Sequence, residues 1–498
     1  MKQLSMSQIN ADQVAALVPD DATVALCGNG GGMVEADAIL AALEASFLAT
    51  GHPCNLTLIH GLGIGDGQSL GIQRLAHEGM VKRVIGGHWS WAPNMQRLAR
   101  EDKIEAYTFP AGVIQTLYRE TGANRPGVIT KVGLGTFADP ENGGGKVSPS
   151  ATEDLVEKIK LNGEEYLFYK AIKIDVGIIR ASVADPKGNL SLRQEAVDMD
   201  AQAVALAAHN SGGVVLAQVK ELSETPIIPA RLVRIPGILV DHVLLEPEFD
   251  QCRGIAYEAA ISGEELGHVD EKITLPTGVR GIIAKRAAQE LGDAVSVNFG
   301  YGIPDGVAAY LKSWGKAYWG TVEQGAHNGT MIGGALFGAA RYPEAIVPST
   351  EQFDFYSGGG VDTCFLGMGE MDAQGNVNVS WLGQDLVGPG GFVDISQPAK
   401  KVVFCGTFEA KGLKVSEQGG QLSIDQFGEV AKLVLQVKHI TFSGKEARKN
   451  GQQVVYVTER AVFEMTEEGI ALVEIAPGID LKKDVLDRMS FKPIVRLS

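Results

Sequence analysis

Short apolar runs recur along the chain, each bounded by glycine, proline or polar residues. Four examples are residues 83–87 (RVIGG), 214–219 (VVLAQV), 401–406 (KVVFCG) and 453–458 (QVVYVT). Runs of this kind are typical of strands that are buried on both faces. Such strands belong to parallel or mixed sheets with helices packed on them. The pattern therefore predicts an α/β fold.

The same order of elements occurs twice in the chain. Residues 21–30 (DATVALCGNG) align with residues 293–302 (DAVSVNFGYG), so that Asp, Ala and both glycines coincide. Each segment predicts a strand that runs into a glycine-rich turn. A helical pattern follows in each copy, at 33–48 (MVEADAILAALEASFL) and at 304–314 (PDGVAAYLKSW). An internal repeat of this kind indicates two similar α/β halves.

A second pair of segments supports the repeat. Residues 175–192 (DVGIIRASVADPKGNLSL) match residues 362–379 (DTCFLGMGEMDAQGNVNV), and residues 212–219 echo 399–406. Each member of the first pair predicts a buried strand, a turn containing Asp-x-x-Gly-Asn, and a second strand. The offset between copies differs from that of the glycine turns, so the first half carries extra residues between its two repeated segments.

The length of the chain also indicates more than one domain. A chain of 498 residues is too long for a single hydrophobic core. Residues 246–271 are acidic and irregular, which is typical of a connecting segment. We expect an N-terminal domain at 1–245, a connector at 246–274 and a C-terminal domain at 275–498.

Composition and charge narrow the partners and the compartment. Apolar residues make up 45% of the chain and the net charge is −16, so nucleic acid and anionic membranes are not expected as partners. No apolar run reaches the length of a membrane span, and the first residues lack a signal core. The five cysteines form no CxxC pair, which favours a reducing compartment. These features predict a cytoplasmic protein.

Several familiar motifs fail in this sequence. The dinucleotide-binding fingerprint needs a third glycine, but Met33 and Asp305 stand at that position in the two turns. The glycines still permit close approach of a phosphate or a thioester carbonyl, although each turn alone is equally consistent with a plain tight turn. P-loop, H-E-x-x-H and G-x-S-x-G motifs are absent, and the histidines do not cluster with acids at metal-ligand spacing, so no metal is expected. His88, beside two tryptophans, is interpreted as a packed structural residue.

Glu323 is the most informative acid. No lysine or arginine lies within five positions of it, and the segment 316–325 (KAYWGTVEQG) alternates as a strand does before it breaks at Gly325. The carboxyl end of a strand is where ligands bind in open α/β sheets. A carboxylate there can attack a reactive acyl group if N–H donors lie nearby, and Gln324 or Asn328 could help. Local sequence alone favours a solvated loop acid over a placed reagent.

Several segments, taken in chain order, resemble one family. They include FPAGVIQTLYRE, VGLGTFADPENGGGKVS, IPGILVDHV, VNFGYGIPDGVA, TVEQG, QFDFYSGGGVDTCFLG and GPGGFVDIS. Together they resemble the acetate/propionate CoA-transferases of the family I CoA-transferases, which also contain succinyl-CoA:3-ketoacid CoA-transferase. The resemblance covers nearly the whole chain. It implies two similar open-sheet α/β domains in one chain, which agrees with the repeat, and an active site where they meet.

The resemblance also implies a mechanism and its residues. CoA moves from a short-chain acyl-CoA to a small carboxylic acid by a ping-pong route, through a glutamyl–CoA thioester on Glu323. Gly391 of the GPGG loop donates an oxyanion-hole N–H. The residues that the resemblance places at CoA are Gly300, Tyr301, Gly302 and Gly388. Acyl-CoA is a substrate and no cofactor is bound permanently, and homo-oligomers are common in this family.

One departure keeps other functions open. Relatives usually read FPQG, in which the glutamine is the other oxyanion donor, but Ala111 stands there in this chain. Gln115, one helical turn further on, is a possible substitute. The change leaves two alternatives, an acyl-CoA thioesterase on the same site and a non-catalytic sensor of CoA metabolites.

Overall fold

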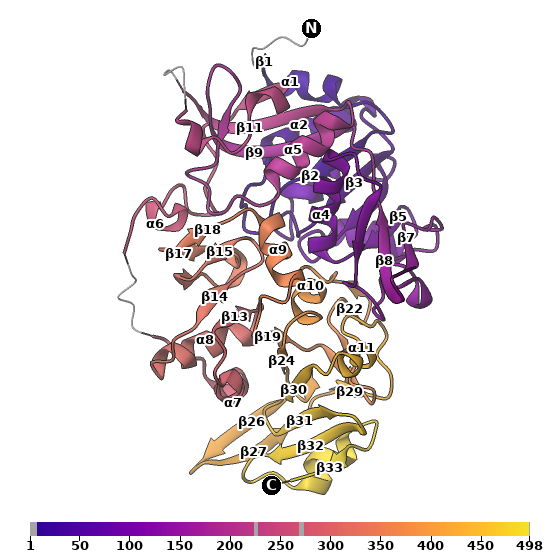
Figure 1. The fold of residues 1–498 in the computed structure, drawn as a ribbon, viewed down its shortest axis with the longest axis vertical. Coiled ribbons are helices and arrows are strands. Elements are labelled where there is room, and N and C mark those ends of the chain that lie inside the picture. Colours follow the sequence, from indigo (N-terminus) through magenta and orange to yellow (C-terminus); the bar gives the residue numbers. More distant parts are fainter. Residues whose placement is uncertain (1–6, 224–227, 268–272, 498) are drawn as a thin grey trace.

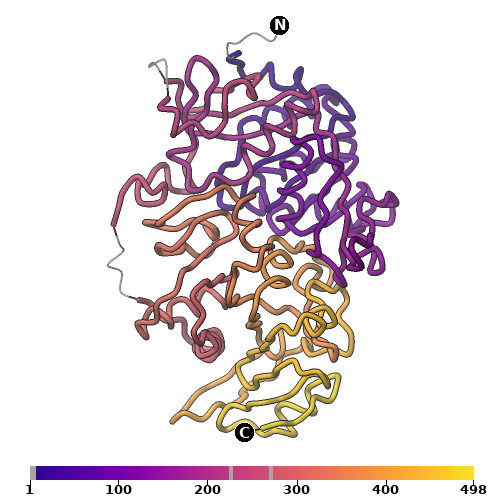
Figure 2. The backbone as a smooth tube through the Cα atoms, viewed as in Figure 1, coloured from indigo at the N-terminus to yellow at the C-terminus, as the bar shows by residue number. Residues whose placement is uncertain are grey.

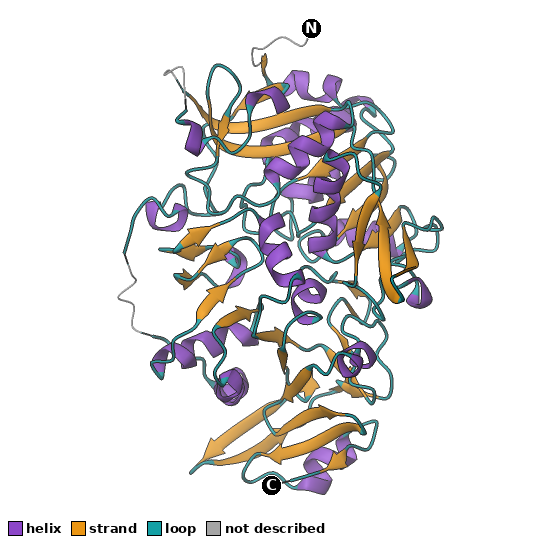
Figure 3. Cartoon of the chain, in the orientation of Figure 1, coloured by secondary structure: helices purple, strands orange, loops and turns teal. Residues whose placement is uncertain are grey.

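Each half of the chain forms around one large sheet. The computed structural model describes residues 7–223, 228–267 and 273–497. In Figures 1 and 2 the N-terminal half, indigo to magenta, lies above the C-terminal half, orange to yellow. Strands and helices alternate along both halves, and helices pack on the sheets (Figure 3). The predicted α/β class is confirmed.

The N-terminal sheet is parallel along its whole path, in the order β1–β12–β11–β9–β2–β3–β4–β5. Its strands are β1 (Ser7–Ile9), β2 (Thr23–Leu26), β3 (Leu56–His60), β4 (Val81–Gly86), β5 (Glu105–Thr108), β9 (Val176–Ala184), β11 (Val214–Leu222) and β12 (His242–Leu245). A short strand, β10 (Leu190–Ser191), pairs antiparallel with β9. Alternate side chains of one strand enter different cores: Ile178 joins one apolar cluster and Ile179 the other. The sheet is therefore buried on both faces, as its uninterrupted apolar runs predict.

The C-terminal sheet has the order β18–β15–β14–β13–β19–β24–β30–β31–β32–β33. Its strands are β13 (Ser296–Phe299), β14 (Trp319–Thr321), β15 (Ala326–His327), β18 (Ala345–Ile346), β19 (Thr363–Gly367), β24 (Lys401–Cys405), β30 (Gln453–Val457), β31 (Ala461–Thr466), β32 (Gly469–Ile475) and β33 (Ile494–Val495). The central strands from β14 to β30 are parallel. Helices α7 (Gly278–Ala288) and α8 (Ile303–Ser313) cover one face of this sheet.

The interface between the halves is built from helices. Helix α4 (Ala111–Gly122) of the N-terminal half packs against α9 (Ser349–Ser357) and α10 (Phe392–Ser396) of the C-terminal half (Figure 1). Side chains of all three helices belong to one continuous apolar cluster, to which Ile114, Phe353 and Val393 contribute. The two domains therefore share a core at the place where the resemblance puts the active site.

The strand order confirms the internal repeat. The sequence β12–β11–β9–β2–β3 in the first half corresponds to β30–β24–β19–β13–β14 in the second, and all neighbours are parallel in both. Part of the extra length of the first half forms a separate sheet of β6 (Gly127–Thr130), β7 (Val156–Leu161) and β8 (Glu164–Lys170).

Both halves contain the predicted buried strand, turn and second strand, but only in the first half does the second strand join the main sheet. There β9 and β10 form a hairpin within the main sheet. In the second half the main-sheet strand β19 ends at Gly367, and β20 (Glu370–Asp372) pairs with β21 (Val377–Asn378) in a separate sheet whose third strand is β29 (Leu433–Val434).

The connector follows the N-terminal half before it crosses to the other. Lys220 donates to the Phe249 carbonyl at 3.0 Å, and the Arg253 N–H donates to the Gly31 carbonyl at 2.6 Å. Helix α6 (Ala259–Ser262) follows, and Glu258 pairs with Arg341 at 2.6 Å. Residues 268–272 lie outside the described part, and the boundaries at 245 and 274 stay a prediction. Across the described ranges, none of the helices combines the length and the apolar character that a membrane span needs.

Candidate active site

Glu323 lies at the carboxyl end of a parallel strand, as the sequence predicts. Strand β14 ends at Thr321, and the chain reverses into β15 through Gly325. Gly325 has a φ of +107°, and a side chain there would lie 1.9 Å from the Val347 carbonyl oxygen. Glycine is therefore required to turn the chain directly after Glu323. The turn leaves the carboxylate at the edge of the sheet that faces the N-terminal half.

Burial changes the acidity of this carboxylate. The surrounding protein removes most of the water from Glu323, although part of the residue stays accessible, and this raises its pKa to about 7. The backbone N–H of Gly391 and the side-chain amide of Gln324 oppose the rise. A carboxylate that is poorly solvated but ionises near neutral pH is a better nucleophile than a solvated one. The geometry favours the placed reagent over the solvated loop acid.

Gly391 touches the carboxylate directly. A methyl group at Gly391 would lie 2.0 Å from Glu323 Oε2 and 2.9 Å from the Phe353 ring. Gly391 has a φ of −84°, so the backbone conformation does not demand glycine. The lack of a side chain is required by space alone, because the carboxylate and the ring occupy the position of a Cβ.

Loops from both halves bind one another beside Glu323. The N–H of Ala111 donates to the Gly390 carbonyl at 2.8 Å, and the N–H of Gly390 donates to the Gly87 carbonyl at 2.8 Å. The N–H of Trp89 donates to the Val387 carbonyl at 2.7 Å. The FPAG and GPGG segments, which are about 280 residues apart in the chain, therefore form one backbone network.

A second carboxyl group lies in the same network. Asp394, on α10, accepts a hydrogen bond from the Gly112 N–H at 3.1 Å. Burial raises the pKa of Asp394 to about 8, and the charge of Glu323 adds to the rise. Sequence reasoning missed this residue. The signal was present, because an acid inside the apolar run FVDIS is either misplaced or held by a partner.

The position of Ala111 supplies no side-chain donor, and Gln115 does not replace it in this conformation. Gln115 is fully buried on α4, and a methyl group at Gly61 would lie 2.8 Å from its Cγ. Neither atom of its amide has a hydrogen-bond partner among the described residues. The structure thus gives no contact in support of Gln115 as the second oxyanion donor.

The turn at residues 300–302 lies beside a cavity. Gly302, with a φ of +95°, caps α8, and Tyr301 is 59% exposed with its ring 5.7 Å from that of Phe337. A cavity of about 320 Å³ opens next to it, lined in part by Phe299, Asp305, Lys312, Tyr318, Asn328 and Phe337. None of Gly300, Tyr301 and Gly302 lines this cavity itself.

Gly388 lies away from that cavity, against the N-terminal half. Its φ is +78°, and a side chain would lie 2.7 Å from the Gly87 carbonyl and 2.9 Å from the His88 Cα. These contacts give Gly388 a structural reason to be glycine. Burial lowers the pKa of His88 to about 4, so His88 stays neutral at physiological pH, in keeping with a structural role.

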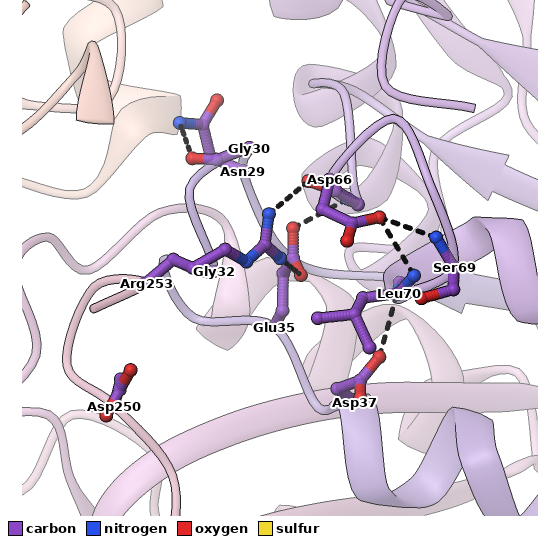
Figure 4. Close-up of polar contacts among 12 residues, drawn as sticks. Asn29, Gly30, Gly32, Glu35, Asp37, Asp66, Ser69, Leu70, Asp250 and Arg253 are labelled. Atoms are coloured by element: carbon purple, nitrogen blue, oxygen red, sulfur yellow. Dashed lines mark hydrogen bonds and ion pairs between the residues drawn. The ribbon is translucent and has the colours of Figure 1, made fainter. Parts of the chain in front are cut away.

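A polar cluster fixes the first glycine turn to the connector (Figure 4). Glu35 accepts from the Gly65 N–H at 2.7 Å, and burial raises its pKa to about 8. The Arg253 guanidinium lies 3.4 Å from Glu35 Oε2 and donates to the Gly65 carbonyl at 3.1 Å. Three backbone N–H groups bind Asp66 in the next loop. No group of three or more His, Cys, Asp or Glu side chains in the described ranges is arranged to hold a metal ion.

Comparison with known proteins identifies the family of the chain. Residues 8–246 match the Coenzyme A transferase family. The acetate CoA-transferase YdiF of Escherichia coli K12 is 41% identical over 490 residues, which are 98% of this chain and 92% of that protein. The chain belongs to the coenzyme A transferase family.

Other relatives agree with this assignment. The caffeate CoA-transferase of Acetobacterium woodii is 43% identical over 98% of this chain and 94% of that protein. A crystal structure of the acyl-CoA transferase YdiF from Escherichia coli O157:H7, a thioester complex with CoA, has a TM-score of 0.94 at 39% identity and covers 99% of this chain and 95% of that one. A mouse succinyl-CoA:3-ketoacid CoA-transferase is 23% identical over 84% of this chain. The protein is a CoA-transferase.

Proposed function

We propose that this CoA-transferase works by a ping-pong mechanism with Glu323 as its covalent nucleophile. A Glu323 oxygen attacks the acyl-CoA carbonyl carbon, the C–S bond breaks, and an acyl–glutamyl anhydride and a CoA thiolate form. The thiolate attacks the Glu323 carbonyl carbon, releases the carboxylate of the first acid, and leaves a glutamyl–CoA thioester. The second acid then runs these steps in reverse.

The observation that carries the proposal is the contact between Glu323 and Gly391. A methyl group at Gly391 would lie 2.0 Å from Oε2, so the Gly391 backbone borders the atom that would attack. The oxyanions formed in both steps need N–H donors, and Gly391 is the proposed donor. A solved relative described as a thioester complex with CoA supports the same chemistry.

We propose that CoA binds at the turn formed by Gly300, Tyr301 and Gly302 and in the cavity beside it. Gly388 stays a prediction for CoA contact. The proposed substrates are short-chain acyl-CoAs and small carboxylic acids, because one relative is named for acetate. Because another relative is named for caffeate, the acceptor acids tested should include an aromatic acid. Homo-oligomer formation and a cytoplasmic location also stay predictions.

A panel of acceptor acids with one acyl-CoA donor tests the proposal. CoA transfer by the unmodified protein should depend on the acceptor, and both Glu323→Ala and Glu323→Gln should abolish it. Full transfer activity in either variant would contradict the proposal. Release of free CoA without any acceptor would indicate the thioesterase, and binding without turnover would indicate the sensor, but the relatives favour neither of these.

A further inference from the structure

Gln324, the residue after the proposed nucleophile, is buried and closely packed although it lies in a loop. Gln324 is 1% exposed, and a methyl group at Gly338 would lie 2.4 Å from its Cδ. Its Nε2 lies 3.2 Å from Asn29 Oδ1 and 3.5 Å from Glu323 Oε1. The first contact is an ordinary hydrogen bond, and the second is at the long limit of one. The amide thus bridges the N-terminal half and the nucleophile.

The hydrogen bonds of Asn29 decide which way both amides face. Asn29 Nδ2 donates to the Gly30 carbonyl at 3.0 Å and to the Phe337 carbonyl at 3.3 Å. Both acceptors are carbonyl oxygens, so the nitrogen of Asn29 must point to them and its oxygen to Gln324. Gln324 must then present its nitrogen to Asn29 and to Glu323. Its own oxygen is buried without a partner among the described residues.

An unpartnered buried oxygen is costly, and turning the amide over would not relieve it. A reversed amide would set the Gln324 oxygen against Asn29 Oδ1 and against the Glu323 carboxylate. The arrangement therefore fixes an N–H toward Glu323 Oε1, on the side away from the Gly391 contact at Oε2.

We infer that Gln324 is a second N–H donor to the reacting carboxyl group of Glu323, and that Asn29 is the residue that positions it. The inference rests on the proposed function. If Oε2 forms the bond to the acyl carbon, Oε1 remains as the carbonyl oxygen of the glutamyl group. When the thiolate adds to that carbon, the C=O electron pair moves onto Oε1. The electron pair on Oε1 then re-forms the C=O bond, the anhydride C–O bond breaks, and the first acid leaves as its carboxylate. The N–H of Gln324 stabilises the charge on Oε1 between these events.

Single-turnover formation of the glutamyl–CoA thioester, followed by intact mass, tests this role. Gln324→Met and Gln324→Glu both remove the N–H, and the second keeps the size of the side chain. Each should slow thioester formation by about 10²-fold, the usual effect of losing one oxyanion donor. Each should also move the pH midpoint of the reaction upward, because the N–H lowers the pKa of Glu323.

Gln218→Met is the matched control. Gln218 is a 1% exposed glutamine in β11 that accepts from the Ala38 N–H at 2.9 Å, and it has no contact with Glu323 in the described ranges. Its replacement should lower thermal stability and leave the pH midpoint unchanged. Wild-type rate and midpoint in both Gln324 variants would overturn the inference alone. No thioester in the unmodified protein would overturn the proposed function, and this inference with it.

A double-mutant cycle tests the part played by Asn29. Asn29→Ala should slow thioester formation in the unmodified protein, but it should add nothing in the Gln324→Met background, because Asn29 acts through Gln324. Fully additive losses would overturn the positioning role, since they would show that Asn29 affects the reaction by another route.

Discussion

At the scale of single residues, the site depends on one carboxylate, Glu323, whose surroundings raise its pKa to near neutral pH. Burial moves the pKa of Glu323 from 4.5 to about 7, and two N–H groups keep it from rising further. Other buried groups nearby are driven toward their neutral forms: the pKa of Asp394 rises to about 8, and that of His60 falls to about 4. Of the two carboxyl groups, Glu323 therefore ionises at the lower pH.

The pH dependence of transfer follows from this value. A nucleophilic carboxylate must be ionised, so kcat/KM should rise about tenfold per pH unit well below pH 7 and level off above it. Steady-state rates between pH 5 and 9, with an acceptor acid that is ionised throughout, measure the profile. A rate that is already level from about pH 5 upward would show that Glu323 keeps its ordinary pKa of 4.5.

Gly391→Ala tests the space beside the nucleophile. The new methyl group would lie 2.0 Å from Oε2, so either the carboxylate or α10 must move. We expect the transfer rate to fall by about 10²-fold or more, as for loss of an oxyanion donor. Gly358→Ala is the control, because Gly358 is exposed at the end of α9 with a φ of −75°. Equal activity in the two variants would contradict the close contact.

At the scale of elements, the halves are joined through helix ends. The first turn of α4 and the first turn of α10 meet at the Gly112–Asp394 hydrogen bond. A side chain at Gly112 would lie 2.5 Å from the Phe353 ring on α9, so three helices converge within one small region. The hydrogen bond at the centre of this contact is surrounded by apolar side chains. Apolar burial holds the halves together, and the hydrogen bond fixes their relative position.

Asp394→Asn tests this contact through its pH dependence. The pKa of Asp394 is raised from 3.8 to about 8, so its contribution to stability is fully present below about pH 4 and is lost as the pH rises through 8. Asparagine stays neutral and can still accept from Gly112. The thermal midpoint of the variant, relative to the unmodified protein, should therefore increase from pH 5 to pH 9.

Asp487→Asn, at an exposed position, serves as the control and should show no such trend. A relative midpoint for Asp394→Asn that is independent of pH would show that Asp394 titrates in the folded protein as it does in the unfolded one.

At the scale of the whole molecule, the internal repeat could be predicted from the sequence, but the contacts between its two halves could not. The two glycine turns are visible in the sequence, and both end parallel strands in equivalent positions of the two sheets. Glu323 stood out because no cation was near it. Asn29 and Gln324 are 295 positions apart, and Gly112 and Asp394 are 282 apart. Such contacts depend on how the two halves pack together, which local sequence patterns do not predict.

The connector is the other whole-molecule feature. Its Arg253 N–H donates to the Gly31 carbonyl of the first glycine turn, and the guanidinium reaches Glu35 and the Gly65 carbonyl. Figure 4 shows Arg253 beside Glu35 and Gly32. Arg253→Met should lower the free energy of unfolding by about 1–2 kcal/mol, since it removes the hydrogen bond to the Gly65 carbonyl and a long contact with Glu35 from a partly exposed arginine. It should also speed proteolytic cleavage near residue 253. Urea unfolding and limited proteolysis measure both effects.

Arg231→Met, at an exposed position, is the control for loss of a surface charge. Arg253→Met with the stability and the cleavage rate of that control would show that the cluster does not hold the connector.

The central claim is that Glu323 becomes covalently bound to CoA. The direct measurement is the mass of the peptide that contains Glu323 after the protein is incubated with a short-chain acyl-CoA and quenched in acid. We predict an increase equal to CoA minus water, located at Glu323 and absent from Glu323→Gln. An unmodified peptide in a preparation that transfers CoA at full rate, or an adduct on any other residue, would contradict the account.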